Sequence, residues 1–155
     1  MAPKPAPVPL ARLLALGFQW MITELHERLA AQGWEGVRPS YGFVLLALRD
    51  GALPQTELAP LLGISKQAAS KLIEAMTDAG LVERESDLAD ARRQLVRLRD
   101  TGHQLLADVE AIYAELEEEW ALLIGTTAMS KMRAGLTHAL LGSHGGELPA
   151  LRPLA

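Results

Sequence analysis

The sequence predicts a mainly helical protein that contains one small β-hairpin. Apolar residues recur at steps of three and four over most of the 155-residue chain, which is the spacing of helices that bury one face. Residues 81–98 instead alternate between apolar and polar side chains, as strands do. Glycines stand between the segments, at Gly33, Gly51, Gly63, Gly80 and Gly125.

Two helices are predicted in the first third of the chain. Residues 1–9 are rich in proline and are expected to form a disordered arm before a helix over about residues 10–33. The apolar side chains of this helix repeat on one face, at Leu10, Leu13, Leu14, Met21, Leu25 and Leu29. A second helix is expected over residues 41–49, with Ser40 as its N-cap.

Two shorter helices follow, and the turn between them at Gly63 is typical of a helix-turn-helix. The first lies within residues 53–65. It contains Pro60, which has no backbone N–H, so we expect a late start or a distorted first turn. The second helix runs from its N-cap Ser65 to about Ala79 and presents a polar face made of Lys66, Gln67, Ser70 and Lys71.

The β-hairpin consists of two predicted strands, residues 81–86 and 93–98, joined by the loop DLADAR. Asp90 and Arg92 lie near the tip of this loop. An arginine on such a projection suits the narrow, strongly negative minor groove of DNA, whereas a surface ion pair with Asp90 is the alternative. Residues 53–99 therefore have the layout of a winged helix-turn-helix head.

The C-terminal part predicts two further helices. A long helix starts from the N-cap Thr101 and carries a one-sided apolar stripe made of Leu105, Val109, Ile112, Leu116, Trp120 and Leu123. A last helix starts near Thr127. We expect the N- and C-terminal helices, about residues 10–33 and 101–141, to form a dimerisation body, with packing inside one chain as the alternative. Residues 142–155 are expected to be a flexible tail.

Charge is distributed unevenly along the chain. The net charge is −4, but residues 63–99 hold seven basic and six acidic side chains. Residues 100–119 hold seven acidic side chains and no lysine or arginine. The sequence thus separates a locally basic head from an acidic body, so a nucleic-acid partner is favoured for the head alone.

Several classes of function are disfavoured. The chain has no cysteine, which excludes a thiol nucleophile and a thiolate metal site. Its histidines lack the spacing of a two-histidine ligand pair, so no metal is expected. No nucleophile–base arrangement and no phosphate-binding glycine loop is visible, so we expect neither an enzyme nor a cofactor. Because charges interrupt every apolar run, we expect no membrane partner and a cytoplasmic location.

Three segments resemble the MarR (multiple antibiotic resistance regulator) family of transcriptional regulators: TELAPLLGIS, ISKQAASKLIEAMTDAGLVER and DLADARRQLVRLRDTGHQLL. The resemblance implies a homodimeric winged-helix protein whose first, fifth and sixth helices interlock. Family members bind palindromic or near-palindromic double-stranded DNA operators and usually repress transcription. They commonly lose DNA affinity when a small aromatic or phenolic ligand binds.

The resemblance also implies roles for individual residues. Ser65, Lys66, Gln67, Ser70 and Lys71 match the helix face that meets the major groove. Asp90 matches the aspartate that holds the wing, and Arg92 matches the arginine that enters the minor groove, with Arg93 beside it in the DNA-binding set. The wing departs from the family where it carries Leu88, Ala89 and Ala91, since members often have more arginine and a proline there.

A ligand pocket is predicted where the body meets the head. Its candidate residues are aromatic side chains and one titratable group, which suit a planar organic acid: Trp20, His26, Trp34, Tyr41 and Phe43. The alternative is that these are ordinary core or surface residues. For the whole chain, the alternative function is a helical winged-helix module that holds a protein partner and does not bind DNA specifically.

Overall fold

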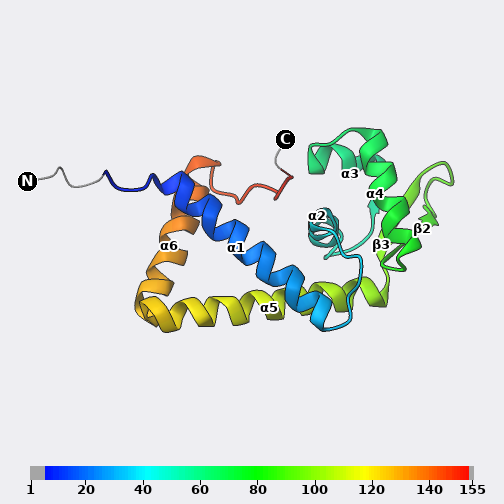
Figure 1. The fold of residues 1–155 in the computed structure, drawn as a ribbon. Helices are drawn as coiled ribbons and strands as arrows, with labels where there is room; N and C mark the ends of the chain where they lie inside the picture. Colours follow the sequence, from blue (N-terminus) through cyan, green and yellow to red (C-terminus); the bar gives the residue numbers. More distant parts are fainter. Residues whose placement is uncertain (1–5, 154–155) are drawn as a thin grey trace, which may run out of the picture.

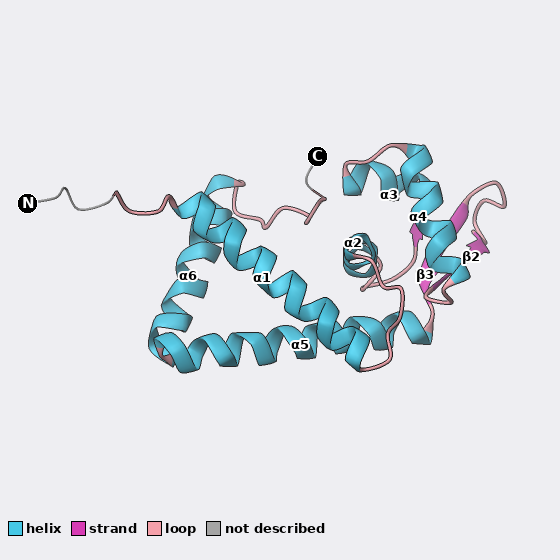
Figure 2. Cartoon of the chain, viewed as in Figure 1, coloured by secondary structure: helices cyan, strands magenta, loops and turns pink. Residues whose placement is uncertain are grey.

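The computed structural model describes residues 6–153. Its elements, in chain order, are α1 (Leu10–Ala31), α2 (Pro39–Ala47), β1 (Leu53–Pro54), α3 (Gln55–Leu62), α4 (Lys66–Asp78), β2 (Val82–Ser86), β3 (Gln94–Leu98), α5 (Asp100–Ile124) and α6 (Thr126–Ser143). Figure 1 shows α1, α5 and α6 forming an open frame, with the remaining elements gathered at the N-terminal end of α5. The predicted fold class, mainly helical with a small sheet, is confirmed (Figure 2).

The sheet is antiparallel and three-stranded, in the order β1-β3-β2. In the hairpin Val82 pairs with Leu98 and Ser86 pairs with Gln94, which confirms the two predicted strands. The strand β1 pairs Leu53 with Val96 and was not predicted, because two residues are too short to show an alternating pattern. We call the hairpin with its loop, residues 82–98, the wing.

The core sits where α1, α2, α4 and α5 meet under the sheet. The C-terminal half of α1 contributes Leu25 and Leu29, while its N-terminal half has no buried residue in the described structure. The α4 helix buries Ala69, Ile73 and Met76. The remaining fully buried side chains include Val44, Leu58, Val96, Leu105, Ile112 and Leu116. The head is thereby fixed on one end of α5.

Helix N-caps were predicted with mixed success. The Ser65 hydroxyl accepts a hydrogen bond from the backbone N–H of Ala68 at 3.0 Å, which confirms that cap. The prediction for Ser40 is wrong, because α2 begins at Pro39, a residue whose fixed φ favours the first helical turn. Thr101 is also not a cap: α5 begins one residue earlier, and the Thr101 hydroxyl donates to the carbonyl of Gly80 instead.

The late start expected for α3 is wrong as well. This helix begins at Gln55 and contains Pro60 in its interior. The proline removes the hydrogen bond that the carbonyl of Thr56 would accept within the helix. Because Thr56 and Pro60 are both exposed, water can supply the missing donor. The helix therefore keeps its full first turn, which is the turn that lines the groove described below.

The C-terminal segment turns back toward the head. The α6 helix ends at Ser143, and residues 144–153 return along the molecule to the end of α3 (Figure 1). There Arg152 Nε donates to the carbonyl of Leu61 at 3.0 Å. The flexibility expected for residues 142–155 stays a prediction. Of the predicted N-terminal arm, residues 1–5 lie outside the described residues.

Candidate nucleic-acid interface

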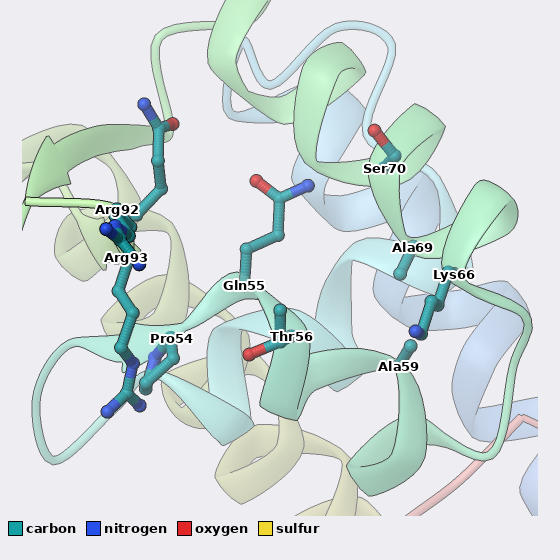
Figure 3. A pocket seen from close by; sticks show the side chains of 10 residues that line it. Pro54, Gln55, Thr56, Ala59, Lys66, Ala69, Ser70, Arg92 and Arg93 are labelled. Carbon is teal, nitrogen blue, oxygen red and sulfur yellow. The ribbon is translucent and has the colours of Figure 1, made fainter.

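A groove of about 460 Å³ lies between the helix-turn-helix and the wing. It is lined by the first turns of α3 and α4 and by the start of β3. Figure 3 shows Arg92 and Arg93 on one side of this groove, Lys66 and Ser70 on the other, and Gln55 between them. The other lining residues are Pro54, Thr56, Ala59, Ala69 and Gln94. The groove therefore has a small-residue floor and cationic walls.

The structure brings together four of the predicted DNA-binding residues. Lys66 and Ser70 from α4 face Arg92 and Arg93 from the wing across the same groove. The other four lie around it: Ser65 caps α4, Gln67 and Lys71 are exposed on α4, and Asp90 lies in the wing loop. The amphipathic pattern of α4 predicts Lys66 and Ser70 on its outer face, whereas the two arginines come from the wing.

Hydrogen bonds shape the wing loop. The Asp90 carboxylate accepts from the backbone N–H of Arg92 at 3.0 Å, and the Asp87 carboxylate accepts from that of Ala89 at 2.9 Å. The backbone N–H of Arg93 also donates to the Asp90 carbonyl. Asp90 therefore holds the loop in shape, while Arg92 makes no ion pair with it in the part of the chain that the structure describes. The Arg92 guanidinium remains accessible to a partner.

Several cations of the head are already engaged by the protein. Arg97 pairs with Glu83 and Glu85 on the neighbouring strand. Arg93 approaches Glu57 at 3.4 Å, and Arg84 Nε donates to Gln55 Oε1 at 2.8 Å.

By contrast, two groove cations have no carboxylate within ion-pair distance among residues 6–153: Lys66 and Arg92. The positive charge that the groove offers to a partner is therefore carried mainly by this pair. A count of charges along the sequence does not distinguish them from the neutralised cations.

A second, smaller cavity of about 90 Å³ lies between α1, α2 and α5. It is lined by two of the predicted ligand residues, His26 and Phe43. Burial lowers the pKa of His26 below its usual value, and a hydrogen bond with the Val37 backbone opposes this effect. Burial, with a smaller contribution from Glu110, raises the pKa of Tyr113 in the same cavity. Sequence reasoning missed Tyr113 and Arg38, which line it from a helix and a loop.

The other three predicted ligand residues lie elsewhere. Trp20 stacks on Trp120 with ring centroids 5.5 Å apart and planes inclined by 23°. Trp34 Nε1 donates to Asp108 Oδ2 at 2.7 Å, which ties the α1–α2 connection to α5. Tyr41 is part of the hydrophobic core. The structure thus does not bring the five aromatic and titratable candidates into one pocket.

A large apolar cavity of about 960 Å³ opens on the body. It lies between the N-terminal half of α1, the C-terminal half of α5, and α6. Its apolar lining includes Leu10, Leu13, Leu14, Trp120, Met132 and Leu140. No residue of α6 is buried in the described chain, so this helix packs with only part of its surface.

Within residues 6–153 no group of three or more histidine, aspartate or glutamate side chains is arranged to hold a metal ion. Over the same residues, none of the helices combines the length and the apolar character that a membrane span requires.

The helix-turn-helix, the wing and the cationic groove between them define a winged-helix protein. A family model described as "MarR family" matches residues 35–93, from before α2 to the end of the wing loop. Over these residues the chain is similar to the MarR family.

A curated protein with a related description is also similar to this chain. A candidate transcriptional regulatory protein for the hcr operon of Thauera aromatica is 25% identical over 88 residues, which cover 56% of this chain and 53% of that protein. The chain thus spans about half the length of this curated relative.

Solved structures show the same fold. Wild-type MarR from E. coli in its apo form aligns with a TM-score of 0.72 at 21% identity, over 88% of this chain and 99% of that one. A mutant of S. aureus MepR bound to an oligodeoxyribonucleotide aligns with a TM-score of 0.63 at 20% identity, over 89% of this chain and all of that one.

Proposed function

We propose that this protein is a homodimeric, sequence-specific DNA-binding regulator that represses transcription from a palindromic operator. The observation that carries the proposal is the cationic groove between α4 and the wing. Lys66 and Arg92, which pair with no carboxylate in the described part of the chain, face each other across a space lined with small and polar side chains. Such a surface suits the phosphodiester backbone, because phosphate contacts are made chiefly by lysine and arginine.

Recognition of the DNA sequence is assigned to the exposed face of α4. In a docked winged helix the N-terminal part of the second helix points at base edges in the major groove. Gln67, Ser70 and Lys71 occupy that part of α4, and the Ser65 cap orients it. The Arg92 side chain on the wing is assigned to the adjacent minor groove, whose negative potential attracts a guanidinium.

Dimerisation is assigned to the apolar cavity of the body. Exposed apolar surface on this scale marks a protein interface in a chain that is otherwise well packed. A two-fold dimer would place two copies of α4 in successive major grooves, about 34 to 36 Å apart. The operator is then an inverted repeat with half-sites one helical turn apart.

Release of DNA by a small aromatic acid is assigned to the cavity that holds His26 and Phe43. This cavity lies between helices of the body, α1 and α5, and a helix of the head, α2. At about 90 Å³ it is smaller than the roughly 300 Å³ or more of typical ligand pockets. A planar ligand has to widen it, with Arg38 available for a carboxylate, and widening moves the head relative to the body.

Selection from a pool of random double-stranded DNA tests the proposal. The parent protein should enrich an inverted repeat, and its affinity for that DNA should fall steeply with salt. Gln67→Ala should return an altered consensus, with Gln104→Ala on α5 as the matched control. Failure to enrich any sequence, together with salt-independent binding of a protein partner, would instead identify an interaction module.

A further inference from the structure

We infer that Gln55 is a further DNA-contacting residue, which donates its side-chain amide to a phosphodiester oxygen, and that Arg84 is the residue that positions it. The inference rests on the proposed function, since it concerns the same groove. Neither residue belongs to the set that the sequence pattern or the family resemblance marks as DNA-binding.

The position of Gln55 supports the inference. It is the first residue of α3 and lines the groove between Lys66 and the wing arginines. Ala59 and Ala69 form the nearby floor, so no bulky side chain blocks the approach of a backbone phosphate. In a helix-turn-helix complex the first helix of the pair crosses the DNA backbone, which assigns a phosphate rather than a base to this position.

The hydrogen bond from Arg84 fixes the orientation of the Gln55 amide. Arg84 lies on β2, 29 residues away, and its Nε donates to Gln55 Oε1 at 2.8 Å. A guanidinium has donors only, so the atom that faces it must be the amide oxygen, and the opposite orientation is excluded. The NH₂ group must then point away from Arg84, and Figure 3 shows it on the side of the groove where Ser70 lies.

The amide NH₂ is free to donate. Within residues 6–153 Gln55 Nε2 donates to no protein acceptor. Because its oxygen already accepts from a cation, the amide is polarised, and its N–H groups become better donors. An anionic oxygen is the acceptor that gains most from such a donor, and hydrogen bonds to charged groups are the stronger ones. Arg84 therefore acts through Gln55 and does not need to touch the DNA.

Gln55→Ala should weaken binding to the selected inverted repeat and to unrelated DNA by a similar factor, roughly tenfold for a lost bond to a charged group. The salt dependence should not change, because glutamine carries no charge and releases no counterion. The consensus returned by selection should also stay the same. Gln104→Ala, which removes a glutamine from α5, is the matched control.

Arg84→Ala tests the positioning role in a double-mutant cycle. Arg84→Ala should lower the DNA affinity about as much as Gln55→Ala does. The double variant should bind DNA no more weakly than either single variant. A lowered salt slope with additive losses would mean that Arg84 contacts phosphate itself, and this result would overturn the assignment. Thermal unfolding of every variant shows whether α3 still folds.

The outcomes separate this inference from the proposed function. If the parent does not bind DNA, the proposed function fails. If the parent binds and Gln55→Ala binds equally well, only this inference fails. If Gln55→Ala changes the consensus, the contact is to a base, and the phosphate assignment is wrong.

Discussion

The head and the body of this protein bury their apolar residues to very different extents. In the head, α3, α4 and the sheet each contribute side chains that are fully enclosed, such as Leu58, Met76 and Val96. In the body, α6 buries no residue, and leucines of α1 remain about half exposed, including Leu13 and Leu14. The head therefore encloses its own hydrophobic core, whereas the body leaves an apolar face exposed.

Their charges differ in the same sense. In the head, Lys66 and Arg92 line a groove and pair with no carboxylate among residues 6–153. The body joins α1 to α5 through Arg28, which contacts Glu24, Glu115 and Glu119. Such partly exposed pairs add little stability each. The difference supports the proposal that the head binds an anionic partner and the body binds a second copy of the chain.

The largest expected effect is on the core of the head. Leu58 is 0% exposed, so Leu58→Ala should lower the free energy of unfolding by about 2 to 5 kcal/mol. Leu88→Ala at the tip of the wing is the matched control and should change it by less than about 0.5 kcal/mol. Denaturant unfolding followed by circular dichroism measures both. Equal losses in the two variants would contradict the description of the head as a packed domain.

The second-largest effect is expected from a charge placed on the apolar face of the body. Leu140 on α6 is 45% exposed and lines the large cavity, so Leu140→Glu should convert a dimer into monomers without unfolding them. Affinity for an inverted repeat should then fall by roughly a hundredfold, because the second half-site no longer binds intramolecularly. Analytical ultracentrifugation reports the mass. The same charge at Leu88 should leave the oligomeric state unchanged, and a Leu140→Glu dimer would rule out this interface.

What the sequence predicts well is what depends on neighbouring residues. The Ser65 cap, the polar face of α4 and the hairpin strands are local patterns, and all three are confirmed. The Ser40 and Thr101 caps fail for different reasons. Pro39 starts α2 one residue earlier, and the hydroxyl of Thr101 finds a distant carbonyl on Gly80.

Contacts between distant segments could not be predicted. The bond from Arg84 to Gln55 joins residues from separate elements, and nothing in either local sequence marks it. The same holds for the pairing of Arg93 with Glu57, which decides how much charge the groove offers. The five ligand candidates are predicted from residue type alone. Of these, His26 and Phe43 share a cavity and the other three do not, because aromatic side chains serve stacking and core packing equally well.

A smaller effect is expected where an acidic side chain pairs with an arginine of the groove. Glu57 approaches Arg93 at 3.4 Å, so Glu57→Gln should free that arginine and raise the affinity for unrelated DNA by roughly two- to fivefold at low salt. Glu74→Gln, on α4 outside the groove lining, is the control for the change in net charge. Fluorescence anisotropy measures both. If the affinity for DNA rises equally in the two variants, Arg93 has no local role in DNA binding.

The smallest effect concerns His26 at the junction of body and head. Its pKa is lowered on folding, so the folded state favours the neutral ring. Stability should be fully present above the unfolded pKa of about 6.5 and should decline as the pH falls below it. His26→Gln should flatten this decline, with His103→Gln as control. Thermal unfolding from pH 8 to 5 measures it, and an unchanged profile in His26→Gln would refute the assignment.

The central claim is that Lys66 and Arg92 of each copy in a dimer contact DNA at the groove. The salt dependence of DNA binding tests this claim most directly. The slope of log affinity against log salt is compared for the parent and for the Lys66→Ala, Arg92→Ala double variant on the selected inverted repeat. The double variant removes four cations per dimer, and each of them displaces about one counterion from the DNA, so the slope should fall in magnitude by about 3.6. An unchanged slope would contradict the account, because the groove would then carry no phosphate.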